Sequence, residues 1–422
     1  MSWLLLLLSL CGIALIVNAH APIRAWWGIG PSFFGAWLAN ELAAWNIVIT
    51  IAVTALLVGW GALDEPVGVV GLALSVLVVL GLVRLLVIAQ QARRVFEATL
   101  EDLPPTDPPT RFRPWVVAFP FWLHDRRLQR AKNLQYASES TRRHRLDVWR
   151  LEDGRPGAPT GGAPVLFQIH GGAWIIGNKD QQGRPLMFEL ADRGWVCVAP
   201  NYRLSPKATF PDHLIDVKLA LAWVKEHIHE YGGDPDRIVV TGGSAGGHLA
   251  SLVALTANDP DYQPGFEAAD TSVIGAVPIY GIYDFQAVFD VPRSRDRRFA
   301  DYLARLVMKA SVAENPALFA SASPTSWVTD AAPPFLVIHG DHDNLAEVAQ
   351  ARTFVPALRS ISREPVYYAE LPGATHAFDV FYSVRSEHSV HGAVRFCEWV
   401  AARALTRAET PDPSATQEDV PG

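Results

Sequence analysis

Ser244 lies at the centre of a Gly-Gly-Ser-Ala-Gly segment, residues 242–246, that could present its hydroxyl as a nucleophile. The apolar run 237–243 predicts a strand before it, and the stretch 245–257 predicts a helix after it. A G-x-S-x-G between a strand and a helix is typical of a sharp turn that exposes the serine, with small neighbours that let the backbones pass closely. A phosphate-binding loop is disfavoured because no G-K-[ST] follows. A flexible glycine-rich corner is the other alternative.

A serine hydroxyl needs a base to take its proton, and the base needs an acid to orient it. Both residue types follow later predicted strands, in the order serine, acid, histidine. Asp341 and Asp343 come after one such strand, and His376 comes after the next. His388 and His391 lie farther along, near the start of the last predicted helix, and are less well placed. The order predicts a Ser-Asp-His catalytic group.

The negative charge of a tetrahedral intermediate would need hydrogen-bond donors. The segment HGGAW, residues 170–174, follows an earlier predicted strand, and its glycines allow backbone N–H groups to point toward the serine. The N–H of Ala245, directly after the serine, would complete an oxyanion hole. A simple Gly-Gly turn is the alternative interpretation of this segment.

The elements around these residues alternate between short apolar strands and helical stretches. Strands are expected at 144–152, 164–171, 195–203, 237–243, 273–281, 334–341 and 366–373. Helices are expected at 183–194, 211–231, 245–257, 344–361 and 389–406. This alternation predicts an α/β fold, with a mostly parallel sheet and helices on both faces. In such folds the chemistry gathers at the carboxyl ends of the strands, where these glycines, aspartates and histidines lie.

Six motifs in order resemble the hormone-sensitive-lipase-like carboxylesterases, which have the α/β-hydrolase fold. They are HGGAW (170–174), NYRLSP (201–206), YGGDPDRI (231–238), GGSAGGHLA (242–250), HGDHDN (339–344) and GATHAF (373–378). The resemblance covers about residues 133–407. The HGGAW variant is also similar to prenylcysteine methylesterases, which are membrane-anchored, and to kynurenine formamidases.

The resemblance implies that Ser244 is the nucleophile and His376 the general base. Asp343 matches the acid of the family's D-x-L segment, and Asp341 is the alternative. His170 would brace the oxyanion loop without reacting. The loop and the residue after the serine match Gly171, Gly172, Ala173 and Ala245. Ala173 replaces the third glycine of the commoner HGGG but keeps its N–H. We expect this chemistry to use no metal or cofactor.

The first hundred residues have the composition of a membrane region. Half of the 422 residues are hydrophobic, and the mean hydropathy is +0.13. Apolar segments occupy residues 2–17, 42–63 and 67–89. The last two are long enough to cross a hydrocarbon core of roughly 30 Å. The first is shorter, and "AHA" at 19–21 resembles a signal-peptide cleavage site. A buried soluble hairpin is the alternative for the other two.

Charge predicts the orientation of the chain in the bilayer. Basic residues crowd after the third segment, at Arg93, Arg94, Arg111, Arg113, Arg126, Arg127, Arg130 and Lys132. The positive-inside rule therefore predicts a multi-pass protein with three spans and a cytoplasmic catalytic domain. If the first segment is cleaved, two spans remain and the domain would face outside. The net charge of −7 makes nucleic acid an improbable partner.

The sequence predicts four regions. Residues 1–100 form the membrane region, and 101–132 form a proline-rich and basic linker. Within the linker, 115–131 is interpreted as an amphipathic segment on the membrane, a cover for a pocket, or a packing helix. Residues 133–407 form the catalytic domain, with an insertion at 282–326 that could cap the pocket. Residues 408–422 form a polar tail predicted to be disordered.

The predicted partners are the lipid bilayer and a small-molecule or lipid ester, with a short, medium or lipid-like acyl group. An amidase or formamidase with the same residues is the main rival function. A prenylcysteine-type methylesterase is a further possibility. A catalytically silent membrane scaffold is disfavoured by the complete set of Ser, Asp and His.

Overall fold

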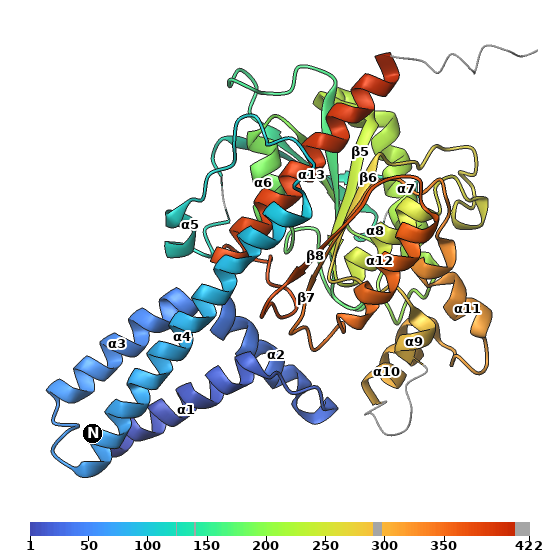
Figure 1. Cartoon of the computed structure of the whole chain (residues 1–422). Helices are drawn as coiled ribbons and strands as arrows, with labels where there is room; N and C mark the ends of the chain where they lie inside the picture. Colours follow the sequence, from blue (N-terminus) through green and yellow to red (C-terminus); the bar gives the residue numbers. More distant parts are fainter. Residues whose placement is uncertain (124, 139–140, 290–297, 410–422) are drawn as a thin grey trace, which may run out of the picture.

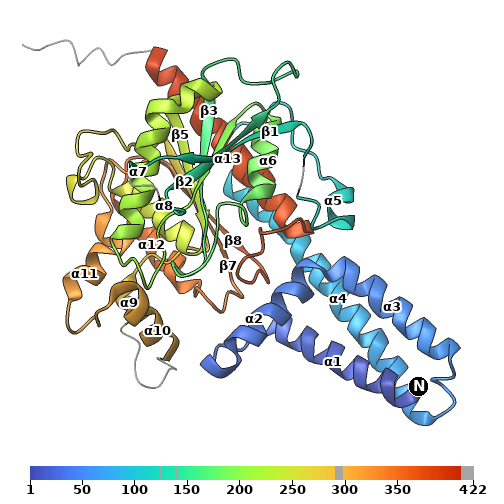
Figure 2. The ribbon, with the colours of Figure 1, turned by 180° about the vertical axis from the view of Figure 1, so that it is seen from behind.

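The computed structural model describes residues 1–123, 125–138, 141–289 and 298–409. An arm of N-terminal helices extends from one side of an α/β domain (Figures 1 and 2). Residues 290–297 of the predicted insertion and 410–422 of the predicted tail lie outside the described residues.

The α/β domain is built on one eight-stranded sheet in the order β1-β2-β4-β3-β5-β6-β7-β8. Strands β1 and β2 are antiparallel to their neighbours, whereas β3 to β8 are parallel. The strands are β1 Leu128–Gln135, β2 Arg145–Leu151, β3 Ala163–Ile169, β4 Val196–Pro200, β5 Gly233–Gly243, β6 Gly275–Ile279, β7 Phe335–Gly340 and β8 Val366–Leu371. The predicted fold class, a mostly parallel sheet with helices on both faces, is confirmed.

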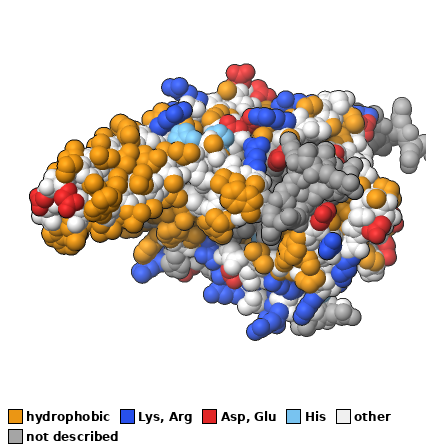
Figure 3. All heavy atoms as spheres, turned by 90° about the horizontal axis from the view of Figure 1, so that it is seen from below, with side chains coloured by type: hydrophobic (Ala, Val, Ile, Leu, Met, Phe, Trp, Pro, Cys, Tyr) orange, Lys and Arg blue, Asp and Glu red, His pale blue; other side chains and the backbone are white. Residues whose placement is uncertain are grey.

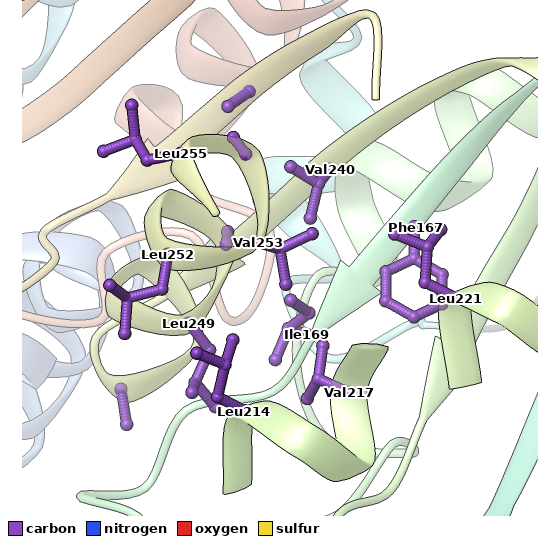
Figure 4. Close-up of a cluster of buried hydrophobic side chains, with 14 of the residues drawn as sticks. Phe167, Ile169, Leu214, Val217, Leu221, Val240, Leu249, Leu252, Val253 and Leu255 are labelled. Atoms are coloured by element: carbon purple, nitrogen blue, oxygen red, sulfur yellow. The ribbon is translucent and has the colours of Figure 1, made fainter. Parts of the chain in front are cut away.

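Helices cover the sheet on both sides (Figures 1 and 2). The principal ones are α6 Arg184–Asp192, α7 Asp212–His227, α8 Ala245–Leu255, α12 Ala349–Ile361 and α13 Val384–Glu409. Alternate residues of each strand point to opposite faces. Phe167 therefore belongs to the buried cluster that includes residues of α7, α8 and α12. Leu166 belongs to the cluster on the other face, with residues of α6 and α13. Figure 4 shows the first layer, where Leu249 and Val253 of α8 lie near Ile169.

The arm consists of four apolar helices, α1 Ser2–His20, α2 Trp26–Glu41, α3 Ala43–Gly59 and α4 Pro66–Thr99. Helices α1 and α4 are each long and apolar enough to cross a membrane. Helices α2 and α3 meet that test only as a pair, and the pair is bent by 87°. The second predicted span, 42–63, is thus the shorter helix α3, and α2 was not predicted. Figure 3 shows hydrophobic side chains over much of the visible face of the arm, with acidic side chains at its tip.

Helix α4 connects the arm with the domain and packs against it. It continues ten residues beyond the predicted span 67–89 and packs against α13. A Cβ added to Gly392 of α13 would lie 2.1 Å from the Phe96 ring, so the two helices touch closely here. A second contact is the buried ion pair between Glu41 of α2 and Arg385 of α13. Ser383 donates to the other oxygen of Glu41 at 2.6 Å.

The segment 115–131 differs from the sequence-based interpretation. Its only described helix is the short α5, Pro114–Ala118, and strand β1 begins at Leu128. The sheet of the α/β domain therefore begins at Leu128, five residues before the predicted domain boundary at 133. Strand β1 is mostly polar because it is an edge strand. Asp147 of β2 accepts hydrogen bonds from the Arg130 side chain and the Asn133 N–H, and these bonds help to hold the edge.

The insertion between β6 and β7 contains short helices in its described part, α9 Phe285–Phe289, α10 Arg298–Leu303 and α11 Pro316–Ser321. Phe285 packs against Trp174, with ring centroids 5.2 Å apart, and against His248 of α8, at 4.5 Å. His248 donates from Nε2 to the Ala322 carbonyl at 2.7 Å. Burial lowers the pKa of His248 to about 3, so the ring is neutral in the folded protein.

Loss of Glu41 should destabilise the protein. Glu41→Ala leaves the Arg385 guanidinium buried without its partner, which typically costs about 3–5 kcal/mol. We expect a clear drop in the unfolding midpoint of the detergent-solubilised full chain. Arg352→Ala is the control, because its pair with Glu370 is exposed and should matter little. Equal losses in the two variants would contradict the assigned importance of the buried pair.

His248 should make the protein less stable in acid. The pKa of His248 is lower in the folded chain than the usual 6.5 of an unfolded one, so the unfolded chain binds one more proton between those values. The contribution of His248 to the free energy of unfolding is fully present above about pH 6.5. Below that pH it falls by about 1.4 kcal/mol per pH unit. Denaturant unfolding at pH 7 and pH 5 measures this loss. His248→Gln should show a smaller loss between the two, and an unchanged loss would refute the assignment.

Candidate active site

Ser244 occupies the turn between β5 and α8, in a conformation rare for a residue with a side chain. Its φ is +59° and its ψ is −123°. Its N–H donates to the Ile279 carbonyl at 2.9 Å, which fixes the turn to the end of β6. The residue is half-buried although its neighbours are buried. A strained, partly exposed serine between a strand and a helix has the geometry of a nucleophile elbow.

Glycines make this turn possible because backbones approach closely around it. A Cβ on Gly246 would lie 2.1 Å from the Ile169 carbonyl oxygen of β3. A Cβ on Gly242 would lie 2.6 Å from that same oxygen. Backbone atoms cannot move away as a flexible side chain can, so a methyl group at either position would displace the elbow. The G-x-S-x-G spacing therefore reflects packing against β3.

Asp343 and His376 are brought together at the carboxyl ends of β7 and β8. His376 Nδ1 donates to Asp343 Oδ2 at 2.6 Å. The other carboxylate oxygen accepts the N–H groups of Leu345 and Ala346, both at 2.9 Å. The Asp343 side chain is fully buried, and His376 is 7% exposed. The carboxylate thus holds the imidazole in one tautomer, with Nε2 free to act as a base.

The alternative acid and histidines lie in other environments. Asp341 accepts the Gly373 N–H at 2.7 Å and caps a turn. His388 meets Gln90 of α4 at 2.9 Å, and His391 lies beside Glu387 on the same helix. None of the three contacts the Asp343–His376 pair in the interactions described. The geometry therefore favours Asp343 and His376 over these alternatives.

Tyr280 connects the elbow with the histidine. Its ring centroid is 4.6 Å from that of His376. A Cβ on Gly243, next to the serine, would lie 2.6 Å from the Tyr280 hydroxyl. That hydroxyl is hydrogen-bonded to the half-buried Asp379. Burial raises the pKa of both Tyr280 and Asp379. This pair was not predicted, because its members lie 99 residues apart and no local pattern links them.

The HGGAW loop lies directly against the elbow. A Cβ on Gly171 would be 2.4 Å from the Gly243 carbonyl and 3.1 Å from Ser244 Cβ. Gly172, Ala173 and Trp174 follow with φ values of +116°, +51° and +59°. Positive φ at two successive residues with side chains is uncommon and indicates a functional constraint.

One of the predicted oxyanion donors in this loop already has a hydrogen-bond partner. The N–H of Gly171, predicted to be an oxyanion donor, instead donates to Gln182 Oε1 at 2.6 Å. Gln182 was not predicted, because nothing local in its sequence marks it. Gly172 and Ala173 in the strained turn, with Ala245 at the start of α8, remain the predicted donors.

His170 supports the loop and is not placed to react. It stacks on Tyr202, with centroids 4.3 Å apart, and Nδ1 donates to the Gly171 carbonyl at 2.8 Å. Tyr202 in turn donates to the His170 carbonyl at 2.9 Å. Burial lowers the pKa of His170 to about 4, so it stays neutral near pH 7. Among the described residues, no group of three His, Cys, Asp or Glu could hold a metal ion.

Helix α2 contributes residues beside the site that the sequence did not reveal. The Phe33 ring lies 6.2 Å from the His376 ring, edge to face. Trp37 Nε1 donates to the carbonyl of Ala377 at 2.8 Å. The segment before α2 also takes part, since Asn344 Nδ2 donates to the Ile23 carbonyl at 3.0 Å. Both loops that carry the acid and the histidine therefore contact the arm.

Comparison with known proteins identifies relatives of the α/β domain. Residues 155–358 match the BD-FAE family model. The probable carboxylic ester hydrolase LipM of Mycobacterium tuberculosis is 54% identical over 265 residues, 63% of this chain and 60% of that protein. The probable isoprenylcysteine alpha-carbonyl methylesterase ICMEL1 of Arabidopsis thaliana is 28% identical over 222 residues. That alignment covers 52% of this chain and 45% of the plant protein, so the chain spans less than two thirds of either relative.

A solved structure supports the same fold. Esterase B from Lactobacillus rhamnosis superimposes with a TM-score of 0.55 and 18% identity. The superposition covers 76% of this chain and 95% of the esterase. Residues 155–358 therefore match the BD-FAE family model, in agreement with the resemblance to hormone-sensitive-lipase-like α/β-hydrolases that the motifs predicted.

Proposed function

We propose that the protein is a membrane-anchored serine hydrolase that cleaves carboxylic esters. The observation that carries this proposal is the 2.6 Å hydrogen bond between His376 and Asp343. It lies at the carboxyl ends of the strands, where Ser244 also stands on a strained turn. The names of the relatives, carboxylic ester hydrolase and esterase, support the same reaction.

The first step is the acylation of Ser244. Its Oγ attacks the ester carbonyl carbon while His376 Nε2 takes the hydroxyl proton, and Asp343 stabilises the imidazolium. The carbonyl oxygen becomes an oxyanion, which accepts hydrogen bonds from the N–H groups of Ala173 and Ala245, with Gly172 as a further donor. Collapse of the intermediate breaks the bond to the alcohol oxygen, which leaves with the proton from His376.

The second step returns the enzyme to its starting state. Water attacks the acyl-serine ester while His376 takes one of its protons. A second tetrahedral oxyanion forms in the same N–H cradle, then collapses to release the carboxylic acid and return the proton to Ser244 Oγ. Among the residues of the chain, only Ser244 and His376 exchange protons in these steps, while Asp343 and the N–H donors keep their protonation states.

The membrane is the proposed partner of the arm. Helices α1 and α4 have the length and composition of spans, and α3, which meets that test only together with α2 in a bent pair, is the proposed third span. Asp64 and Glu65, at the tip between α3 and α4, are the acidic end of an otherwise apolar hairpin. The positive-inside rule then assigns the basic segment after α4, and the catalytic domain with it, to the cytoplasm.

The plant methylesterase relatives favour a second candidate, hydrolysis of the methyl ester of a lipidated cysteine. This activity would use the same three residues and differs only in the substrate. An amidase is the remaining rival. Steady-state rates on matched ester and amide pairs separate the esterases from the amidase, and a farnesylcysteine methyl ester tests the second candidate directly.

Removal of the nucleophile should abolish activity. Ser244→Ala is expected to lose about 10⁴–10⁶ of kcat for an aryl ester, because no other group can form the acyl-enzyme. It should also lose covalent labelling by a fluorophosphonate. Ser251→Ala is a matched control on the same helix, since Ser251 bonds only the Gly247 carbonyl in the interactions described. Undiminished labelling of Ser244→Ala would refute the nucleophile assignment.

The orientation can be measured with reporters fused after residue 422. Green fluorescent protein, which folds in the cytoplasm, should fluoresce in this fusion. Alkaline phosphatase, which is active only outside the cytoplasm, should give no signal. The opposite pattern would overturn the cytoplasmic assignment and favour two spans.

A further inference from the structure

Helix α2 runs in a different direction from the other helices of the arm. It meets α3 at 87°, and Figures 1 and 2 show it running beneath the α/β domain, away from the bundle of α1, α3 and α4. If α3 and α4 cross the bilayer near its normal, α2 lies along the membrane surface. It would then separate the lipid from the sheet edge that carries the catalytic residues.

One side of α2 contacts the catalytic loops. Phe33 lies edge to face against His376 at 6.2 Å between ring centroids. Trp37, one turn later, stacks with Phe33 at 5.7 Å and donates to the Ala377 carbonyl. Trp37 also packs on Phe381, 5.0 Å away. An aromatic row therefore runs along α2 to the histidine.

An adjacent side of α2 is apolar and exposed, and its Phe34 ring packs against Phe33 with ring centroids 4.9 Å apart. Trp27, Pro31, Phe34 and Leu38 repeat at intervals of four, three and four residues, which places them on one helical face. All four are exposed, Trp27 to 72% and Phe34 to 57%. The face carries no charge. In water such a face would be costly, whereas at a membrane surface it would lie among acyl chains.

A second exposed aromatic segment adjoins α2. Trp115, Phe119, Phe121 and Trp122, in and after α5, are all exposed. The Phe121 ring lies 4.9 Å from Phe381, which also contacts Trp37. Trp45 of α3 donates to the Ala118 carbonyl at 3.2 Å. The two segments thus extend one apolar surface from the arm to the edge of the active site.

We propose that α2 is the bilayer-side wall of the substrate site, and that Phe33 contacts the acyl chain of a lipid ester arriving from the membrane. The ester carbonyl would reach Ser244 while the chain stays among Phe33, Trp37 and Phe381. The chain then avoids water throughout its transfer. This inference rests on the proposed esterase function. It adds the path by which the substrate enters from the bilayer, and Phe33 as the residue that favours long acyl chains.

A photoreactive inhibitor tests the position of the chain in the wild-type protein. The probe is a fluorophosphonate with a dodecyl chain that ends in a diazirine, added to the full chain in phosphatidylcholine vesicles. After attachment to Ser244, light should join the chain end to residues 26–41 or to the aromatic segment 115–122. Cross-links in the insertion 282–326 instead would overturn the inference and favour the cap as the chain site.

A variant pair tests the role of Phe33. Phe33→Ala should lower kcat/KM about tenfold for a p-nitrophenyl dodecanoate in vesicles and less than threefold for p-nitrophenyl acetate. Trp27→Ala is the control, because it removes an aromatic ring from the exposed face of the same helix, where Trp27 is 72% exposed. It should leave the ratio of the two substrates unchanged. Equal losses on both esters in Phe33→Ala would indicate a purely structural role and contradict the proposal.

The two proposals fail in different ways. If the probe does not label Ser244 at all, the serine hydrolase assignment fails and the inference falls with it. If Ser244 is labelled but the chain end cross-links outside α2 and residues 115–122, the esterase function stands and only the wall is wrong.

Discussion

The approach of Gly246 to the Ile169 carbonyl is the contact on which the active site depends. The first turn of α8 presses against the end of β3 so closely that only hydrogen fits between them. This contact places Ser244 at a positive φ and, on the same edge, brings the HGGAW loop beside it. Because β3 and β5 are paired in register up to Ile169 and Gly242, the nucleophile and the donor loop cannot shift independently. The sheet itself would therefore set the geometry of the proposed oxyanion hole.

The arm is an integral part of this architecture. Glu41 is buried with Arg385, and removal of the charge from one partner would leave the other charge buried and unpaired. The hydrogen bonds from Trp37 to Ala377 and from Asn344 to Ile23 reach the residues adjacent to the histidine and the acid. An N-terminal region that served only as an anchor would not need contacts at those two positions. If the arm anchors the protein as proposed, anchoring and positioning are combined in one region.

The sequence predicted those elements that a local pattern of residues can reveal. Strands β3, β5 and β7 are continuous apolar runs, and their elements followed the expected order. Strand β1 was missed because an edge strand such as LQRAKNLQ has no buried stripe. Helix α2 was missed because Gly28, Gly30, Pro31 and Gly35 are poor helix formers. Its stability comes from packing on the domain, as does the pairing of Tyr280 with Asp379, and such long-range contacts leave no mark in a local window.

Helix α4 is continuous from Pro66 to Thr99. At 1.5 Å per residue its length is about 50 Å, and a hydrocarbon core takes up roughly 30 Å of that. The remaining turns form a rigid post that ends against α13. In a bilayer, this post would hold the catalytic residues at a constant height and let the enzyme move only sideways. Encounter with substrate would then depend on surface density and lateral diffusion, not on concentration in solution.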